Sequence, residues 1–177
     1  MGRNRRTDVD FSKHELVVID NEDYKMHYFK LPNTITHSVK FINTQGIMAV
    51  TGDYGNWIFC REFNPHKDGK TSSGYWIEKL QISSCQEPYK FNIEAAQKEI
   101  IESLKSFSDS YSHEEKVWLK ELYQAADDGE YTFIAKAIEH PSSFECECIP
   151  TGKEIDWWLL VIMDAFDEIC DRLKDIV

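Results

Sequence analysis

The spacing of apolar residues changes along this chain, and that change limits the fold more than any other feature of the sequence. Between residues 34 and 41, Ile35, His37, Val39 and Phe41 alternate with small polar or charged residues. A period of two places these four side chains on one face of a β-strand. Later in the chain, apolar residues instead recur at three- and four-residue steps, which is typical of helices.

Five segments of the first third carry strand signals, and turn residues separate them. Asp20–Asn21–Glu22–Asp23 has the composition of a turn, and Pro32 with Asn33 ends the second segment. The predicted strands are residues 16–19, 24–31, 34–41, 46–50 and 57–60. Short connections between successive strands predict an N-terminal antiparallel meander of about five strands.

Helical spacing follows, and capping residues mark two of the helix starts. Asn92 is an N-cap residue type, and residues 93–107 carry an apolar face behind it. Ser112 and Glu115 have the spacing of a capping box, which begins a helix with Trp118 on its apolar face. Shorter helices are predicted at residues 75–82 and 131–139.

The last helical segment has the longest apolar stripe. Its inward residues are predicted to be Trp158, Ile162, Phe166, Ile169, Leu173 and Ile176. Its acidic residues, Asp164, Asp167, Glu168 and Asp171, lie largely outside the stripe and predict a solvated face. We therefore expect an α+β fold in which three to five helices pack on the sheet.

The length of 177 residues suits one domain with one core, so we expect residues 1–177 to form a single α+β domain. Arg3, Arg5 and Arg6 precede the first apolar residues, and we expect residues 1–10 to be a mobile basic arm. Forty-two per cent of the residues are hydrophobic, which is enough to offset the loss of chain entropy.

Composition excludes several classes of function. The net charge of -11 disfavours direct binding to nucleic acid, because such a surface needs clustered Lys and Arg. The longest apolar run, 157–163, is far below the ~20 residues that span a bilayer. No apolar stretch of a signal peptide follows the basic arm, so we expect a cytoplasmic protein that does not bind membranes.

The five cysteines predict free thiols. Their number is odd and their spacing fits no disulfide framework. Cys146 and Cys148, with His140 nearby, do not have the spacing of a zinc site, so we expect no metal and no cofactor. Cys85 has no nearby base in the sequence, and we assign no catalytic residues.

The stretch 50–63, VTGDYGNWIFCREF, is the one candidate site. Gly52 and Gly55 can adopt positive φ, and Asp53 can bind the nearby backbone, so a hairpin turn explains most of it. The large aromatic residues suggest a binding role in addition, with Tyr54 exposed and Trp57 at least partly packed. Our candidate ligand- or partner-binding residues are Asp53, Tyr54, Asn56, Trp57, Arg61 and Trp76.

The same region carries a resemblance to a known group of proteins. Residues 46–86, especially VTGDYGNWIF, YWIEKL and SSCQ, resemble an uncharacterised family from bacteriophages and prophages with a central Gly-Asp-x-Gly-x-aromatic hairpin. The resemblance implies a phage or prophage gene and brings no established activity or fold. Accessory proteins of this size in phages often act by binding.

Three functions follow as hypotheses. The first is a non-enzymatic inhibitor that binds a host-defence protein through the aromatic hairpin and an acidic surface. The second is a sponge for a nucleotide-type signalling molecule, with an aromatic ring stacked on the base and cations such as Arg61, Lys67, Lys70 and Lys79 near the phosphates. The third is a small phosphoesterase built from Asp53, Arg61, Glu62 and His66. The oligomeric state does not follow from the sequence.

Overall fold

The computed structural model describes residues 5–68, 71–83, 87–145 and 148–174. The chain divides into two compact units: unit 1 comprises Met1–Pro88 and Ile155–Val177, and unit 2 comprises Tyr89–Glu154. Each unit encloses its own cluster of buried apolar side chains. The described residues therefore have two cores where chain length alone favours one, because the helices of unit 2 bury their apolar faces among themselves.

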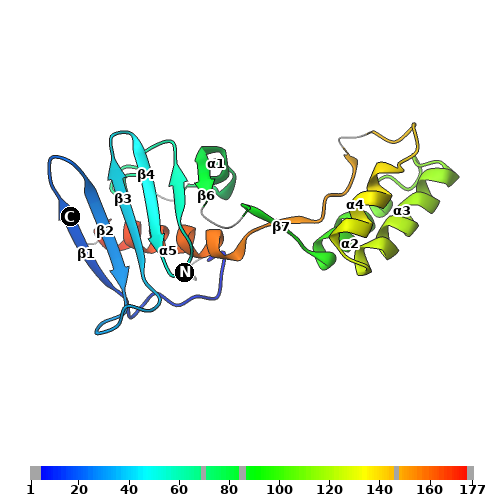
Figure 1. Ribbon diagram of the computed structural model, residues 1–177. Helices are drawn as coiled ribbons and strands as arrows, with labels where there is room; N and C mark the ends of the chain where they lie inside the picture. The colour runs from blue at the N-terminus through cyan, green and yellow to red at the C-terminus, as the bar shows by residue number, and fades with distance from the viewer. Residues whose placement is uncertain (1–4, 69–70, 84–86, 146–147, 175–177) are drawn as a thin grey trace. The chain divides into compact units, whose positions relative to one another are not determined.

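Unit 1 is built on a six-stranded sheet (Figure 1). Its strands are β1 (Glu15–Asp20), β2 (Lys25–Lys30), β3 (Val39–Thr44), β4 (Ile47–Gly52), β5 (Trp57–Phe59) and β6 (Leu80–Ser83). Each strand pairs antiparallel with the next in chain order. The predicted α+β fold with an N-terminal meander is confirmed, and the sheet has one strand more than predicted.

Two sequence predictions about the sheet are wrong in detail. The third strand begins at Val39 rather than Thr34, because His37 has a φ of 55° and Ile35 is 82% exposed. The helix predicted at 75–82 ends earlier: α1 (Ser73–Lys79) is followed directly by β6, whose Ile82 pairs with Ile58. Pairing with β5 supplies backbone hydrogen bonds that a longer helix would have to replace.

One face of the sheet packs on the last helix, α5 (Trp157–Lys174), which crosses behind the strands in Figure 1. Phe166 is fully buried there, with its ring 5.4 Å from that of Phe41 and 5.3 Å from that of Trp76. The C-terminal helix is therefore part of the core of unit 1, as its apolar stripe predicts.

The acidic residues of α5 are not a solvated face, contrary to the sequence prediction. Asp164 is 6% exposed and accepts hydrogen bonds from the Arg6 and Thr7 backbone N–H groups, at 3.0 and 2.7 Å. Glu168 is also buried and accepts from Arg172 at 3.1 Å. Asp164 is satisfied by amides at the other end of the chain, and Glu168 by a cation one turn later on the same helix, so both carboxylates can be buried.

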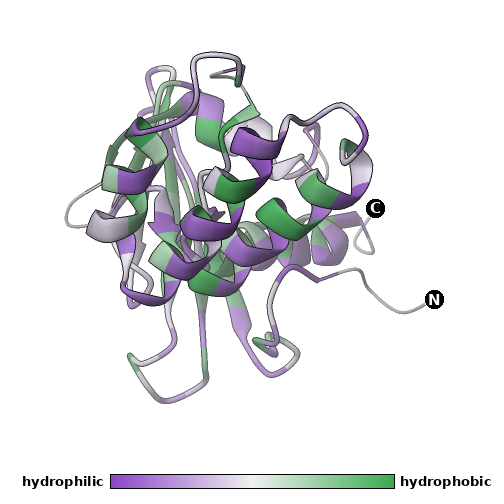
Figure 2. Cartoon of the chain, turned by 90° about the vertical axis from the view of Figure 1, so that its right-hand side faces the viewer, coloured by the Kyte–Doolittle hydropathy of each residue, from purple (hydrophilic) through white to green (hydrophobic). Residues whose placement is uncertain are grey.

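Unit 2 is a three-helix cluster with a short two-stranded sheet at its chain ends. Its elements are β7 (Tyr89–Phe91), α2 (Ile93–Ser106), α3 (His113–Asp127), α4 (Glu130–Ile138) and, at the boundary with unit 1, β8 (Lys153–Ile155). Asn92 caps α2, and Ser112 with Glu115 forms the predicted capping box of α3. Figure 2 shows hydrophilic and hydrophobic residues alternating along the helices, as amphipathic helices require.

Several chemical features can be stated for the described residues. All their helices are too short or too polar to span a bilayer. Cys60, Cys148 and Cys170 form no disulfide in that part of the chain, whereas Cys85 and Cys146 lie outside it. Within the same ranges, no three His, Cys, Asp or Glu residues gather in a way that could hold a metal ion.

Candidate binding site

A groove of about 490 Å³ in unit 1 includes two of the predicted site residues. The side chains around it come from the N-terminal segment, the loop before β3, the β4–β5 loop and the start of α5. They are Val9, Thr36, His37, Asp53, Tyr54, Trp157 and Trp158. We call this the Tyr54 groove. Its volume lies within the range of small-ligand sites.

One wall of the Tyr54 groove is fixed by Asp53. Its backbone N–H donates to the Ser38 carbonyl at 3.0 Å, and its Oδ2 accepts from the Ser38 N–H at 2.7 Å. Gly52 makes this close approach possible, because a Cβ at that position would lie 2.2 Å from the Ser38 oxygen. The paired ends of β3 and β4 therefore hold residues 36–38 beside the β4–β5 loop.

Tyr54 forms the floor of the groove, and the prediction that its side chain is exposed is wrong. The residue is 6% exposed, and its hydroxyl lies 3.1 Å from Nδ1 of His37. Burial, with a smaller effect of the Asp53 charge, raises the pKa of the phenol. His37 is exposed, so it is not the core histidine that strand alternation indicates.

The backbone of His37 is hydrogen-bonded to a second histidine. The His37 carbonyl accepts a hydrogen bond from Nε2 of His14 at 2.8 Å. Because the carbonyl can only accept, this bond places the proton of a neutral His14 on Nε2. Burial lowers the pKa of His14, which favours that neutral form. The loop that carries His37 is therefore anchored on both sides.

The first turn of α5 also lines the groove. Asp156 begins this helix, since its Oδ1 accepts from the Trp158 N–H at 2.8 Å and its carbonyl accepts from Leu160. Trp157 is 46% exposed and Trp158 38% exposed. The ring of Trp157 meets that of Tyr54 edge to face, with centroids 6.4 Å apart. Two large aromatic side chains thus stand at the groove partly in solvent.

The N-terminal segment closes the groove's edge through Val9. This segment is bound to α5, since Arg6 Nη1 lies 3.1 Å from Asp164 and 2.7 Å from Asp167. Arg6 also donates to the Thr71 carbonyl at 2.9 Å. Residues 1–4 lie outside the described part of the chain, but from Arg6 the predicted basic arm is attached to the helix rather than solvated.

The other predicted site residues do not join this groove. Trp57 and Trp76 are buried in the core, where Trp57 Nε1 donates to the Tyr54 carbonyl at 2.8 Å. Asn56 is exposed in the β4–β5 loop. Arg61 follows the far end of β5, where it binds Asp68 at 2.9 Å and the Tyr75 hydroxyl at 2.6 Å. Neither tryptophan can stack on a ligand without leaving the core.

A smaller hollow of about 250 Å³ lies elsewhere on unit 1. Its lining residues are Val18, Asp20, Lys25, His27, Asn43, Glu62, Asn64, Pro65 and His66. Burial lowers the pKa of His27 to about 4, with a smaller effect of His66. Glu62 and His66 of the phosphoesterase hypothesis meet here. Asp53, its third acid–base candidate, lies at the opposite end of β5.

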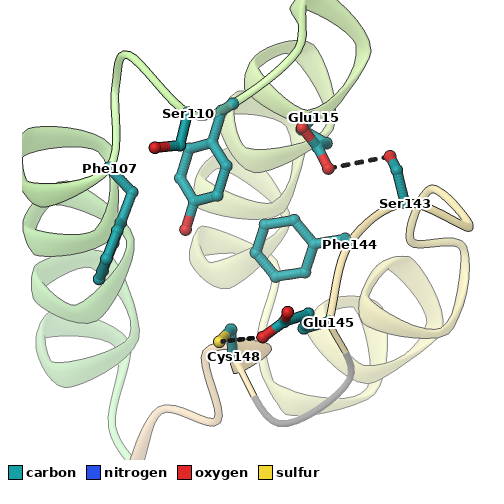
Figure 3. Close-up of a pocket in the computed structure, with 8 residues that line it drawn as sticks. Phe107, Ser110, Glu115, Ser143, Phe144, Glu145 and Cys148 are labelled. Carbon is teal, nitrogen blue, oxygen red and sulfur yellow. Dashed lines mark hydrogen bonds between the residues drawn. The ribbon is translucent and has the colours of Figure 1, made fainter.

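Unit 2 has a pocket of similar size, shown in Figure 3. Ser143 donates to Glu115 at 2.9 Å, and the Cys148 thiol lies 3.9 Å from Glu145. Hydrogen bonds from the Ser112 backbone and from Ser143 lower the pKa of Glu115. That carboxylate also closes the capping box of α3, so its role is structural. No motif in the sequence predicts this pocket.

The chemistry of the Tyr54 groove is aromatic and anionic. Tyr54, Trp157 and Trp158 supply ring surfaces, and Asp53 supplies a carboxylate at an exposed position. None of the described lining residues is Lys or Arg. The sequence did not predict Trp157 and Trp158 as site residues, because Trp158 belongs to the apolar stripe that predicts burial. Asp156, which begins α5, is the signal that could have placed both tryptophans in the first turn of the helix rather than in its buried part.

Comparisons with protein families, with curated proteins and with solved structures find no match to this chain. The groove's geometry and chemistry are therefore the basis for assigning a role.

Proposed function

We propose that this protein acts by binding another protein, and that the Tyr54 groove receives a Lys or Arg side chain of that partner. One observation carries the proposal: two partly exposed tryptophans and Asp53 line one groove, whose described lining residues include no Lys or Arg. The aromatic rings and the carboxylate both favour binding of a cation, and neither favours binding of an anion.

Two attractions favour a cation in the Tyr54 groove. A guanidinium or ammonium group over an aromatic face gains about 0.5–2 kcal/mol, and tryptophan is the strongest such partner. The Asp53 carboxylate adds a charge-assisted contact, since its bond to the Ser38 amide leaves its negative charge in place. The net charge of -11 would also steer a basic partner toward the protein.

The nucleotide-sponge hypothesis has less support from this arrangement. It requires cations for the phosphates, but Arg61 is paired with Asp68 and Lys79 with Glu78, and Lys67 does not line the Tyr54 groove. It also requires an aromatic ring for the base, and its three candidate rings, Tyr54, Trp57 and Trp76, are all buried. Lys70 lies outside the described residues. The phosphoesterase hypothesis has less still, since its four residues do not converge.

The class of partner that we propose rests on the proposed origin of the chain. The resemblance of the hairpin region to phage and prophage proteins makes a host protein, such as a component of a defence system, the class of partner that we propose. A basic surface on that partner would match the groove and the acidic character of the chain. Inhibition would then result from occupying that surface.

Calorimetric titration with two blocked pentapeptides tests the proposal. Ala-Ala-Arg-Ala-Ala carries the cation, and the same peptide with citrulline keeps its shape without the charge. We expect the arginine peptide to bind about fivefold more tightly, which corresponds to ~1 kcal/mol. Trp157→Ala should weaken binding of the arginine peptide, whereas Tyr131→Ala, at an exposed ring of unit 2, should not.

Equal binding of both peptides, or equal effects of the two variants, would contradict this role of the groove. If the peptide result holds, affinity capture from the natural host with the unaltered protein and with Trp157→Ala would identify the partner. ADP, titrated in parallel, provides the comparison for the nucleotide hypothesis.

A further inference from the structure

The edge strand β1 has the properties of a strand that pairs with another chain. It is the first strand in the sheet order, and β2 is its neighbour there. Val17, Val18 and Ile19 are β-branched, consecutive and 40%, 46% and 38% exposed. Edge strands are usually protected by Lys, Pro or a bulge, and β1 contains no Lys or Pro and pairs with β2 in unbroken register.

The hydrogen bonds of the β1–β2 hairpin show which backbone groups point outward. The Asn21 N–H donates to the Tyr24 carbonyl at 3.2 Å, which makes this residue pair a hydrogen-bonded one. Antiparallel ladders alternate hydrogen-bonded and non-hydrogen-bonded pairs. The register therefore directs the backbone groups of Glu15, Val17 and Ile19 toward β2. The N–H and C=O groups of the three alternate residues, Leu16, Val18 and Asp20, point away from the sheet.

We propose that β1 pairs antiparallel with β1 of a second copy of this chain, about a two-fold axis at Val18. In that register Val18 lies opposite the partner's Val18, and Leu16 lies opposite the partner's Asp20. All the outward backbone groups of β1 are then paired. In this register even-numbered residues of β1 lie opposite even-numbered residues of the partner, and odd opposite odd. The sheet faces that α5 covers in the two copies therefore lie on the same side of the joined sheet.

The side chains on the other face of the sheet favour the same register. Ile19, Met26, Ile42, Ala49, Ile58 and Ile82 are directly paired neighbours and form one apolar row across all six strands. In the dimer, Ile19 at the end of this row lies opposite the partner's Val17. Such β-branched cross-strand pairs stabilise antiparallel sheets.

The charged residues before and after β1 favour antiparallel over parallel pairing with the second copy. Lys13 is exposed before β1, whereas Glu22 and Asp23 are exposed after it. Antiparallel pairing brings the end of β1 near Lys13 to the partner's end near Glu22 and Asp23, so that opposite charges meet at both ends of the interface. A parallel pair would place like charges together. None of the residues that line the Tyr54 groove lies in β1.

Sedimentation velocity over a range of protein concentrations tests the dimer. The unaltered chain should approach twice the monomer mass of 20.7 kDa as concentration rises. Val18→Pro should remain a monomer with an unchanged circular dichroism spectrum, because it removes an N–H that points outward. Val18→Lys should also be a monomer, since it places two like charges opposite each other at the axis.

Ile82→Lys is the matched control, because it makes the same kind of change at an exposed position on the opposite edge strand. It should dimerise like the unaltered chain. The proposal is overturned if the unaltered chain stays at 20.7 kDa up to its solubility limit. It is also overturned if both Val18 variants still dimerise, or if Ile82→Lys alone dissociates the dimer.

Discussion

Tyr54 and His37 are joined by a hydrogen bond of 3.1 Å between the phenol hydroxyl and Nδ1 of the imidazole. This bond connects the β4–β5 loop to the loop before β3, two segments whose strands are already held together by Asp53 and Ser38. The hairpin and the loop before β3 therefore hold Tyr54 and Asp53 in position, and α5 completes the groove with Trp157 and Trp158.

Substitution of Tyr54 should lower stability. Tyr54→Phe removes the bond to His37 and should cost about 1 kcal/mol in the free energy of unfolding. Tyr54→Ala also empties the space beneath Trp157 and should cost about 3 kcal/mol. Urea unfolding of both variants measures these losses. An unchanged midpoint for Tyr54→Ala would show that the ring is exposed, as the sequence alone indicates.

Gly52 should tolerate no side chain. A Cβ there would lie 2.2 Å from the Ser38 carbonyl oxygen, and the φ of 141° is already unfavourable for other residues. Gly52→Ala should therefore lower the free energy of unfolding by more than about 1 kcal/mol. Gly74→Ala, where nothing lies within 4 Å, is the control and should be neutral or stabilising. Equal effects at the two glycines would contradict the close approach of β4 to Ser38.

The C-terminal helix should be indispensable to unit 1. Phe166→Ala leaves a cavity among Phe41, Phe63 and Trp76 and should cost about 3–5 kcal/mol in the free energy of unfolding. Ile138→Ala, at an exposed position of unit 2, removes a side chain that packs on little and should cost less than about 0.5 kcal/mol. Thermal and urea unfolding provide the comparison; similar losses for the two variants would place Phe166 outside the core.

Stability should fall as pH decreases below 7, because His27 resists protonation in the folded state. Its folded pKa of about 4 lies below the unfolded value near 6.5, so the unfolded chain binds more protons between these values. Its contribution to stability is complete above pH 6.5 and is lost as pH falls toward 4. From pH 7.5 to 5.5 we expect a loss of about 1 kcal/mol.

His27→Leu should remove this part of the pH dependence, whereas His66→Gln should retain most of it. Urea unfolding at both pH values gives the difference directly. The pKa of His14 is also lowered, so a smaller loss in the same direction should remain in His27→Leu. If stability does not change over this interval in the unaltered chain, His27 is not buried in its neutral form.

Local sequence signals predicted the elements whose determinants are local. The capping box of Ser112 and Glu115 lies within one turn of helix, and the positive φ values of Gly52 and Gly55 follow from the turn. The start of the third strand was not predictable in this way. Residues 34–38 alternate like a strand, but the strand begins only where Asp53, fifteen residues later, binds Ser38.

The candidate site was predicted in part for the same reason. Asp53 and Tyr54 belong to a visible motif, but the partners that turn them into a groove come from α5, more than one hundred residues away. Burial of Asp164 likewise depends on Arg6, at the other end of the sequence. Periodicity places an acidic residue outside an apolar stripe, and it contains no information about a cation that arrives from another segment.

The location of bound arginine tests the central claim most directly. The chain has five tryptophans, and their indole N–H signals can be followed separately in ¹H–¹⁵N NMR spectra during titration with N-acetyl-arginine amide. We expect saturable shifts of the Trp157 and Trp158 signals, little change at Trp57, Trp76 and Trp118, and weaker shifts at the same concentration in Asp53→Asn. Unshifted Trp157 and Trp158 signals, or equal shifts with N-acetyl-citrulline amide, would contradict a groove that binds cationic side chains.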